Sequence, residues 1–185
     1  MDSTLFHVSE TDGIAHFEPR PPRPRVGAPE GARVWAIDDA HLHTYLLPRD
    51  CPRITFWRKA DSAERDVLRF LGSTTARHVL CIESGWLARA MNHRLYIYEM
   101  PAATFELEDD NAGHYISRQA VTPLGVTIID QPLVHLVQRD VELRVMPSLW
   151  ELREAIVDST LAFSITRMRN AAPPPDGFVT QYPVT

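Results

Sequence analysis

Short runs in which apolar and polar residues alternate predict a protein rich in β-strands. A period of two places successive side chains on opposite faces of a sheet. Residues 77–83 differ, because the apolar run at their centre is typical of a strand that is buried on both faces. The strands expected from these patterns cover residues 4–8, 33–37, 53–57, 77–83, 94–100, 114–118, 126–129 and 141–145.

The first of these strands carries polar side chains between its apolar ones. Leu5, His7 and Ser9 share one face, and Phe6 and Val8 share the other. His7 is therefore expected to leave the side that Phe6 and Val8 bury, and to stand where a pocket can form.

Helical spacing separates several of the strands. The apolar stripe over residues 62–71 ends at Gly72, a residue common just after a helix C-terminus, and Ser62 is its expected N-cap. Ser148 and Glu151 have the spacing of a capping box at the start of another helix. The expected helices cover residues 40–46, 62–71, 84–91, 131–139 and 148–159.

Four further segments are less regular. Prolines and arginines over residues 20–30 predict an extended surface loop, and the acidic residues 106–110 predict a turn. Residues 160–170 fit a strand or a helix, and continuation of the preceding helix is favoured. The proline-rich segment from residue 171 is expected to be extended or disordered.

These elements predict an α+β fold, with a bent or split, mostly antiparallel sheet and helices packed outside it. The length of 185 residues suits one domain, which we expect over residues 1–170, followed by the tail 171–185.

Charge and composition narrow the class of function. The net charge of −5 argues against nonspecific binding of nucleic acid, which needs a positive surface. Lys59 is the only lysine, so almost all basic side chains are arginines, which suit bidentate contacts with phosphate or carboxylate. Cys51 and Cys81 are expected to be buried free thiols. The absence of a long apolar run predicts a cytoplasmic protein that does not enter a membrane.

No complete catalytic motif is present. His41 and His43 are two residues apart, but on the predicted helix they diverge and are expected on a solvated face, so no metal site is predicted. Polar and aromatic residues on the predicted strands and their flanks remain as ligand-binding candidates. They are His7, Ser9, Arg20, Trp35, Tyr45, Arg49, Ser117 and Arg118.

The chain resembles an uncharacterised family of small bacterial proteins that is known only as a domain of unknown function. The resemblance runs from Leu5 to about Asn170 and implies no activity. It rests on residues 5–9, 17–20, 34–38, 48–53 and 167–170, which read LFHVS, FEPR, VWAID, PRDCPR and RMRN.

A more distant resemblance is to the ADP-ribosyltransferase superfamily. It implies that His7 bonds the ribose of NAD and that Trp35 packs on nicotinamide. In that superfamily a late strand holds a catalytic glutamate, and residues 114–118 have none. The RNA 2′-phosphotransferase branch instead uses arginines and histidines around a phosphate, which implies such a part for Arg20, Arg49 and Arg118.

Two hypotheses follow. The first is a pocket that binds NAD, ADP-ribose or another phosphate-bearing nucleotide. In it His7 and Ser9 are hydrogen-bonding groups, Trp35 or Tyr45 is a stacking wall, and Arg20, Arg49 and Arg118 are anion contacts. The second is a noncatalytic structural or interaction protein, with a homodimer joined by a sheet edge or by the helices that carry Trp86 and Trp150.

Overall fold

The computed structural model describes residues 4–22 and 31–183. Most of the predicted loop 20–30 therefore lies outside the described residues. Contacts divide the chain into two compact units, each built from two separate stretches. Unit 1 comprises Met1–Leu46 and Arg94–Asp130, and unit 2 comprises Leu47–His93 and Gln131–Thr185. The predicted domain boundary at residue 170 stays a prediction.

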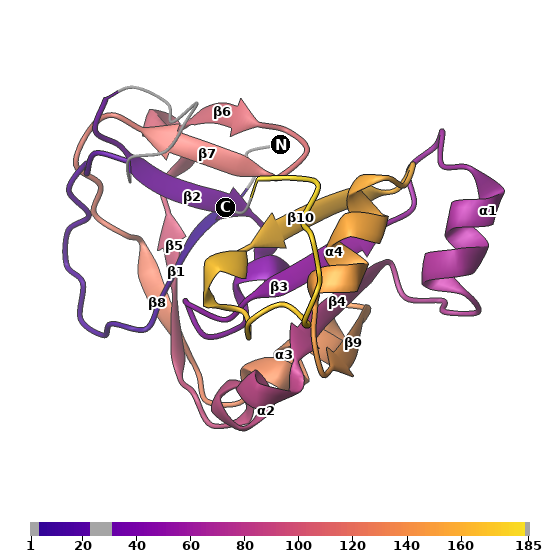
Figure 1. The fold of residues 1–185 in the computed structure, drawn as a ribbon. Coiled ribbons are helices and arrows are strands. Elements are labelled where there is room, and N and C mark those ends of the chain that lie inside the picture. The colour runs from indigo at the N-terminus through magenta and orange to yellow at the C-terminus, as the bar shows by residue number, and fades with distance from the viewer. Residues whose placement is uncertain (1–3, 23–30, 184–185) are drawn as a thin grey trace. The chain divides into compact units, whose positions relative to one another are not determined.

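Unit 1 is built on a six-stranded sheet in the order β6-β7-β2-β1-β5-β8, with neighbouring strands antiparallel throughout (Figure 1). Strands β1 and β2 occupy its centre, so the two ends of the sheet are formed by β6 and β8. The strands are β1 (Leu5–Ser9), β2 (Val34–Asp38), β5 (Leu95–Met100), β6 (Glu106–Asp109), β7 (His114–Ser117) and β8 (Gly125–Ile129), with 3-10 turns η1 (Leu42–Tyr45) and η3 (Ala102–Thr104).

One core cluster of unit 1 lies on the sheet face that carries Leu5 and His7. Leu5, Ala36 and Tyr98 are buried there together with Phe17, which crosses from the segment after β1. The prediction that His7 leaves the buried side was wrong. Phe6 and Val8 remain partly exposed, because Phe17 and the tyrosines of β5 fill the other face; these partners are distant in sequence.

Unit 2 is built on a four-stranded sheet in the order β10-β3-β4-β9, in which β4 and β9 are parallel and the other pairs antiparallel. Its strands are β3 (Arg53–Trp57), β4 (His78–Glu83), β9 (Val141–Met146) and β10 (Ala162–Thr166). Its helices and helical turns are α1 (Glu64–Asp66), the π-turn η2 (Val67–Leu71), α2 (Ser84–Met91), α3 (Pro132–Gln138), α4 (Trp150–Val157) and η4 (Met168–Asn170).

The central strand β4 of unit 2 is buried from Val79 to Glu83, as its apolar run predicted. On one side Ile54 and Cys81 pack with Ile156 of α4. Together the two sheets confirm the expected mixture of α and β structure with mostly antiparallel pairing.

Two predicted elements were wrong. Residues 106–109 form strand β6 instead of a turn, because backbone pairing with β7 holds an acidic segment whose residues are all exposed. Residues 162–166 form strand β10 instead of more helix, because all five pair with β3. In the second case the local pattern was ambiguous and the neighbouring strand decided it.

Helix starts differ from the predicted caps. Helix α4 begins after Leu149, and α1 begins after Ala63, in neither case with a side-chain cap. Ser62 instead accepts a hydrogen bond from the Lys59 amide at 3.0 Å. Gly72 does end its helix as predicted, with a φ of 60° that favours glycine.

The proline-rich tail is extended and bound along α4 in unit 2 (Figure 1). Trp150 Nε1 donates to the carbonyl of Ala172 at 2.7 Å, and its ring packs against Phe178. Arg153, which is buried, donates to the carbonyl of Tyr182 at 3.2 Å. Trp150 is therefore part of the core of unit 2 and not an exposed dimer contact.

The two cysteines are buried, as predicted, and burial raises the pKa of both the Cys51 and the Cys81 thiol to about 12. Because the thiolate is the reactive form, we expect neither to react with a thiol reagent at pH 8 in the folded protein. The measurement is labelling with Ellman's reagent. The reagent should react slowly with the native protein and should label two thiols per chain in denaturant. Labelling of either thiol at the rate of a free cysteine in native buffer would contradict this.

Asp66, the last residue of α1, is hydrogen-bonded to Thr160, just before β10. The amide and hydroxyl of Thr160 donate to its carboxylate at 2.8 and 2.7 Å, and these bonds hold the pKa of Asp66 below its ordinary value. The stabilisation is thus present above the pKa in the unfolded chain, ~3.9, and is lost as the pH falls through the lower folded pKa.

We therefore expect Asp66→Asn to lower the melting temperature at pH 7, and the difference from wild type to shrink as the pH falls below about 3.9. Thermal unfolding at several pH values tests this. Asp61→Asn is the control, because Asp61 is exposed and has only a surface ion pair with Lys59. A difference that is constant with pH would show that ionisation of Asp66 is not its source.

Candidate functional site

Three arginines lie near one another at one end of the sheet of unit 1. Arg20 and Arg33 exchange two backbone hydrogen bonds of 3.0 Å. Val34 pairs with Ser117 at the end of β7, and Arg118 follows in a bend. Arg33 Nε donates to the carbonyl of Gly31 at 3.2 Å, and a Cβ on Gly31 would lie 3.1 Å from Arg118 Nη1, so both side chains lie beside this glycine. Directly opposed residues share a face of the sheet. We refer to Arg20, Arg33 and Arg118 as the arginine row.

The central member of the row, Arg33, is paired with a carboxylate. Arg33 is buried, and its Nη1 donates to Glu108 at 3.0 Å. Arg20 and Arg118 are exposed, and neither forms an ion pair with a described residue. Like charges directly opposite one another on a sheet are destabilising. The row therefore carries more positive charge than the described carboxylates around it neutralise.

An aromatic group continues the row along the same face. The Arg33 guanidinium lies 5.7 Å from the centre of the Trp35 ring, and the Trp35 and His114 ring centres are 5.7 Å apart. Tyr45 lies on the far side of His114, with 2.8 Å between its hydroxyl and His114 Nε2. Two of the ligand-binding candidates, Trp35 and Tyr45, thus both contact His114.

His7 does not face this group. Phe6 pairs with Ile37, so Trp35 shares the face of Phe6, and the side chain of His7 lies on the opposite one. His7 Nδ1 donates to the carbonyl of Trp35 at 2.8 Å, just past the last register pair of β1 and β2, and its ring lies 4.6 Å from Phe17. These contacts give His7 a role in holding the sheet together.

The two serines make local hydrogen bonds. Ser9 Oγ accepts from the amide of Thr11 at 3.0 Å, a turn interaction. Ser117 is buried, and its hydroxyl lies 3.2 Å from Thr104 Oγ1 and 3.2 Å from the Gln119 amide. By strand alternation Ser117 faces away from the arginine row.

Arg49 belongs to unit 2, so we describe it separately from the arginine row. Its carbonyl accepts from Arg167 Nε at 3.1 Å, and the next carbonyl, of Asp50, accepts from Asn170 Nδ2 at 2.7 Å. Arg167 has a left-handed φ of 62°, which is uncommon for a residue other than glycine. Two segments that are far apart in sequence, 48–53 and 167–170, are thereby joined.

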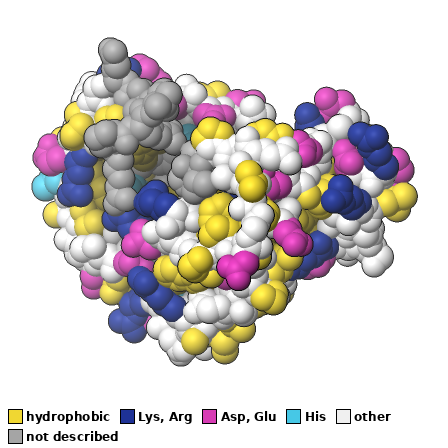
Figure 2. Space-filling view, viewed as in Figure 1, with side chains coloured by type: hydrophobic (Ala, Val, Ile, Leu, Met, Phe, Trp, Pro, Cys, Tyr) yellow, Lys and Arg dark blue, Asp and Glu magenta, His cyan; other side chains and the backbone are white. Residues whose placement is uncertain are grey.

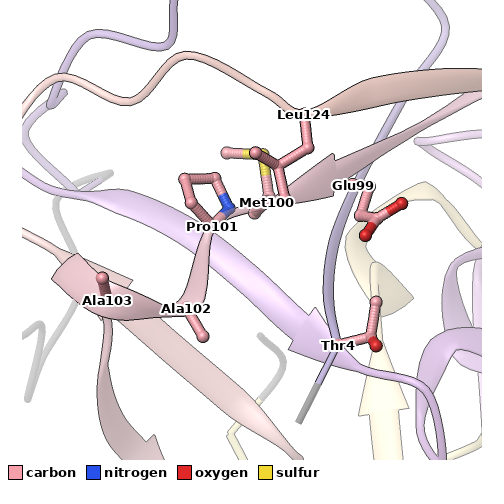
Figure 3. Close-up of a pocket in the computed structure, with 7 residues that line it drawn as sticks. All are labelled: Thr4, Glu99, Met100, Pro101, Ala102, Ala103 and Leu124. Carbon is pink, nitrogen blue, oxygen red and sulfur yellow. The ribbon is translucent and has the colours of Figure 1, made fainter. Parts of the chain in front are cut away.

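Two open hollows lie beside Thr4, just before β1. One, of about 480 Å³, has Glu99 and Thr4 on one side and Met100, Pro101 and Leu124 on the other (Figure 3). The second, of about 470 Å³, is lined by Thr4, Phe6, Asp38, Asp39 and Ala40. Neither contains a residue predicted from sequence to bind a ligand. Their charged side chains are carboxylates, which disfavour a phosphate.

The prediction that His41 and His43 lie on a solvated helix face was wrong. His43 is buried, and His41 Nδ1 lies 2.8 Å from Asp38 Oδ1. Gly113, with a φ of 64°, packs against this pair so closely that a Cβ there would lie 2.3 Å from His41 Nδ1. Among the described residues, no group of three or more His, Cys, Asp or Glu side chains is arranged to hold a metal.

Comparison with known proteins places the chain in one family. The model of a family of unknown function (DUF6886) matches residues 6–171. The chain belongs to this family. No curated protein and no solved structure matches it. The uncharacterised family expected from the sequence is thus confirmed, over nearly the same residues.

The matched region of this DUF6886 protein contains the arginine row and the aromatic group, as well as the joined segments of unit 2. Since the family has no assigned function, the roles of these residues are argued from their contacts. In the described part of the chain no helix is long and apolar enough to span a membrane.

The contacts of His7 generate a stability prediction. His7→Ala removes the hydrogen bond to the Trp35 carbonyl and the contact with Phe17, and we expect a loss of about 1–3 kcal/mol in the free energy of unfolding. Urea unfolding measures it. His16→Ala is the matched control, because His16 is exposed and contacts Thr122 at the surface, and we expect a change of less than about 0.5 kcal/mol. Equal effects of the two substitutions would contradict this role.

Proposed function

We propose that this DUF6886 protein binds a phosphate-bearing nucleotide on unit 1, with the arginine row as the phosphate site and Trp35 as the surface on which a base or nicotinamide ring packs. The observation that supports the proposal is the grouping of Arg20, Arg33 and Arg118, in which Arg33 is paired with Glu108, while Arg20 and Arg118 form no ion pair with the residues that the structure describes.

Guanidinium groups suit this task because their fork of donors matches the oxygens of a phosphate, and such charge-assisted hydrogen bonds are about twice as strong as neutral ones. In the proposed complex, Arg20 and Arg118 contact the phosphate from the two flanking strands. Arg33 stays bound to Glu108 and supports the Trp35 ring from the side. A diphosphate supplies enough charge to satisfy both flanking arginines.

The distribution of charge supports a small ligand over a polymer. Acidic and basic side chains are interspersed on the face of the molecule in Figure 2, and the net charge is −5. Binding of a long nucleic acid needs many phosphate contacts over a positive surface. The arginine row is a local site of three residues, which suits one nucleotide.

NAD and ADP-ribose are the first ligands to test, because each carries a diphosphate and an aromatic base. The superfamily resemblance of the sequence motivates the same choice. Its glutamate has no counterpart in β7, which reads His-Tyr-Ile-Ser and is followed by Arg118. The proposal is therefore binding, through arginines as in the 2′-phosphotransferase branch, and includes no transfer step.

A calorimetric titration of the full chain with ADP-ribose, NAD and inorganic pyrophosphate tests the proposal. We expect Arg118→Ala and Arg20→Ala each to weaken binding by about 10-fold or more, since a charged hydrogen bond contributes about 1.5–3 kcal/mol. Arg94→Ala is the matched control, because Arg94 is an exposed arginine of the same unit paired with Asp130. It should bind like wild type.

Trp35→Leu separates the two parts of the site. It should weaken binding of ADP-ribose and leave that of pyrophosphate unchanged, because pyrophosphate has no ring to stack. Absence of binding at millimolar concentrations of all three ligands would reject the proposal, and so would equal losses in the Arg118→Ala and Arg94→Ala variants.

A further inference from the structure

The two edges of the six-stranded sheet in unit 1 differ in charge. Edge strands expose unpaired backbone groups that can pair with another chain, and charged side chains are a common protection against this. Strand β6 has that protection, with carboxylates at Glu106, Glu108 and Asp109. Strand β8, at the other edge, reads Gly-Val-Thr-Ile-Ile and carries no charge.

Strand β8 also exposes large apolar side chains. Val126 and Ile128, which share a face, are 48% and 51% exposed, and Leu124 just before the strand is 66% exposed. On its inner side β8 pairs with β5 over all five residues, without a bulge. Its outer side is thus a regular, uncharged edge of β-branched residues, without the charges, prolines or bulges that prevent pairing.

We propose that β8 pairs with β8 of a second copy of this chain, antiparallel across a two-fold axis, and joins the two sheets of unit 1 into one. The inference does not depend on the proposed ligand site. A two-fold interface brings the same strand of both copies together, with residue i facing j and j facing i, so charges of one sign on the strand would face charges of the same sign. Strand β6 would repel itself, whereas β8 has no such penalty.

The pairing that uses the whole strand sets Thr127 opposite Thr127 of the second copy. Val126 of each copy then lies opposite Ile128 of the other copy. The two symmetry-related pairs lie on the same face of the joined sheet. β-Branched residues in such cross-strand pairs are favourable. A pair of five-residue strands lies at the small end of specific interfaces, below about 1,200 Å², so the dimer is reversible and depends on concentration.

The first test is sedimentation velocity of the full chain over a range of concentrations. We expect wild type to shift from monomer to dimer, and Ile128→Lys to remain monomeric, because each lysine would lie opposite the apolar Val126 of the other copy and diagonal to the other lysine, about 7–8 Å away. Leu107→Lys on β6 is the matched control, since Leu107 is also 51% exposed on an edge strand. It should dimerise like wild type. A wild-type protein that is monomeric at the highest concentration would overturn the proposal.

The second test keeps the edge uncharged, so it does not depend on how Ile128→Lys folds. In the proposed pairing the Thr127 Cα atoms are about 4.5–5.5 Å apart, within the range of a disulfide. Thr127→Cys should form a covalent dimer on mild oxidation, and both native cysteines are buried. Leu107→Cys should remain largely monomeric. Equal cross-linking of the two variants would reject the β8 interface.

Discussion

Backbone pairing of β2 with a partner on each side determines where the chemistry of unit 1 lies. The segment after β1 brings Arg20 beside Arg33 in an isolated bridge. On the other side of β2, strand β7 leads to Arg118. The same alternation places Trp35 on this face and turns its carbonyl toward the His7 ring. One strand thus supplies the middle of the proposed phosphate site, its aromatic surface and an anchor for the core. A change in its register by one residue would separate all three.

Much of the secondary structure could be predicted, because strand alternation is a local property. Residues 53–57 and 84–91 were placed to the residue. The failures at 106–109 and 162–166 have a common cause, since each segment becomes a strand only through a neighbour, β7 or β3, that local sequence does not specify. The face of His7 was missed for the same reason, because Phe17 approaches from outside the strand.

The candidate site was predictable only in part. Arginines and aromatic residues near strands were recognisable by type, and Arg20, Trp35, Tyr45 and Arg118 come from that reasoning. Arg33 and His114 were missed, although both lay within predicted strands, because their importance depends on register. Ser9 and Ser117 have the right chemistry for binding, but their hydroxyls are already used in local bonds.

The binding of the tail along α4 has a consequence for where this protein ends as a folding unit. The family match stops at residue 171. The carbonyl of the next residue, Ala172, accepts a hydrogen bond from Trp150, and its amide donates to the buried Glu83 at 2.9 Å. A chain shortened to the family border would leave Arg153 and Glu83 with fewer partners for their charges. The segment that defines membership is therefore shorter than the segment that completes the hydrogen bonding of unit 2.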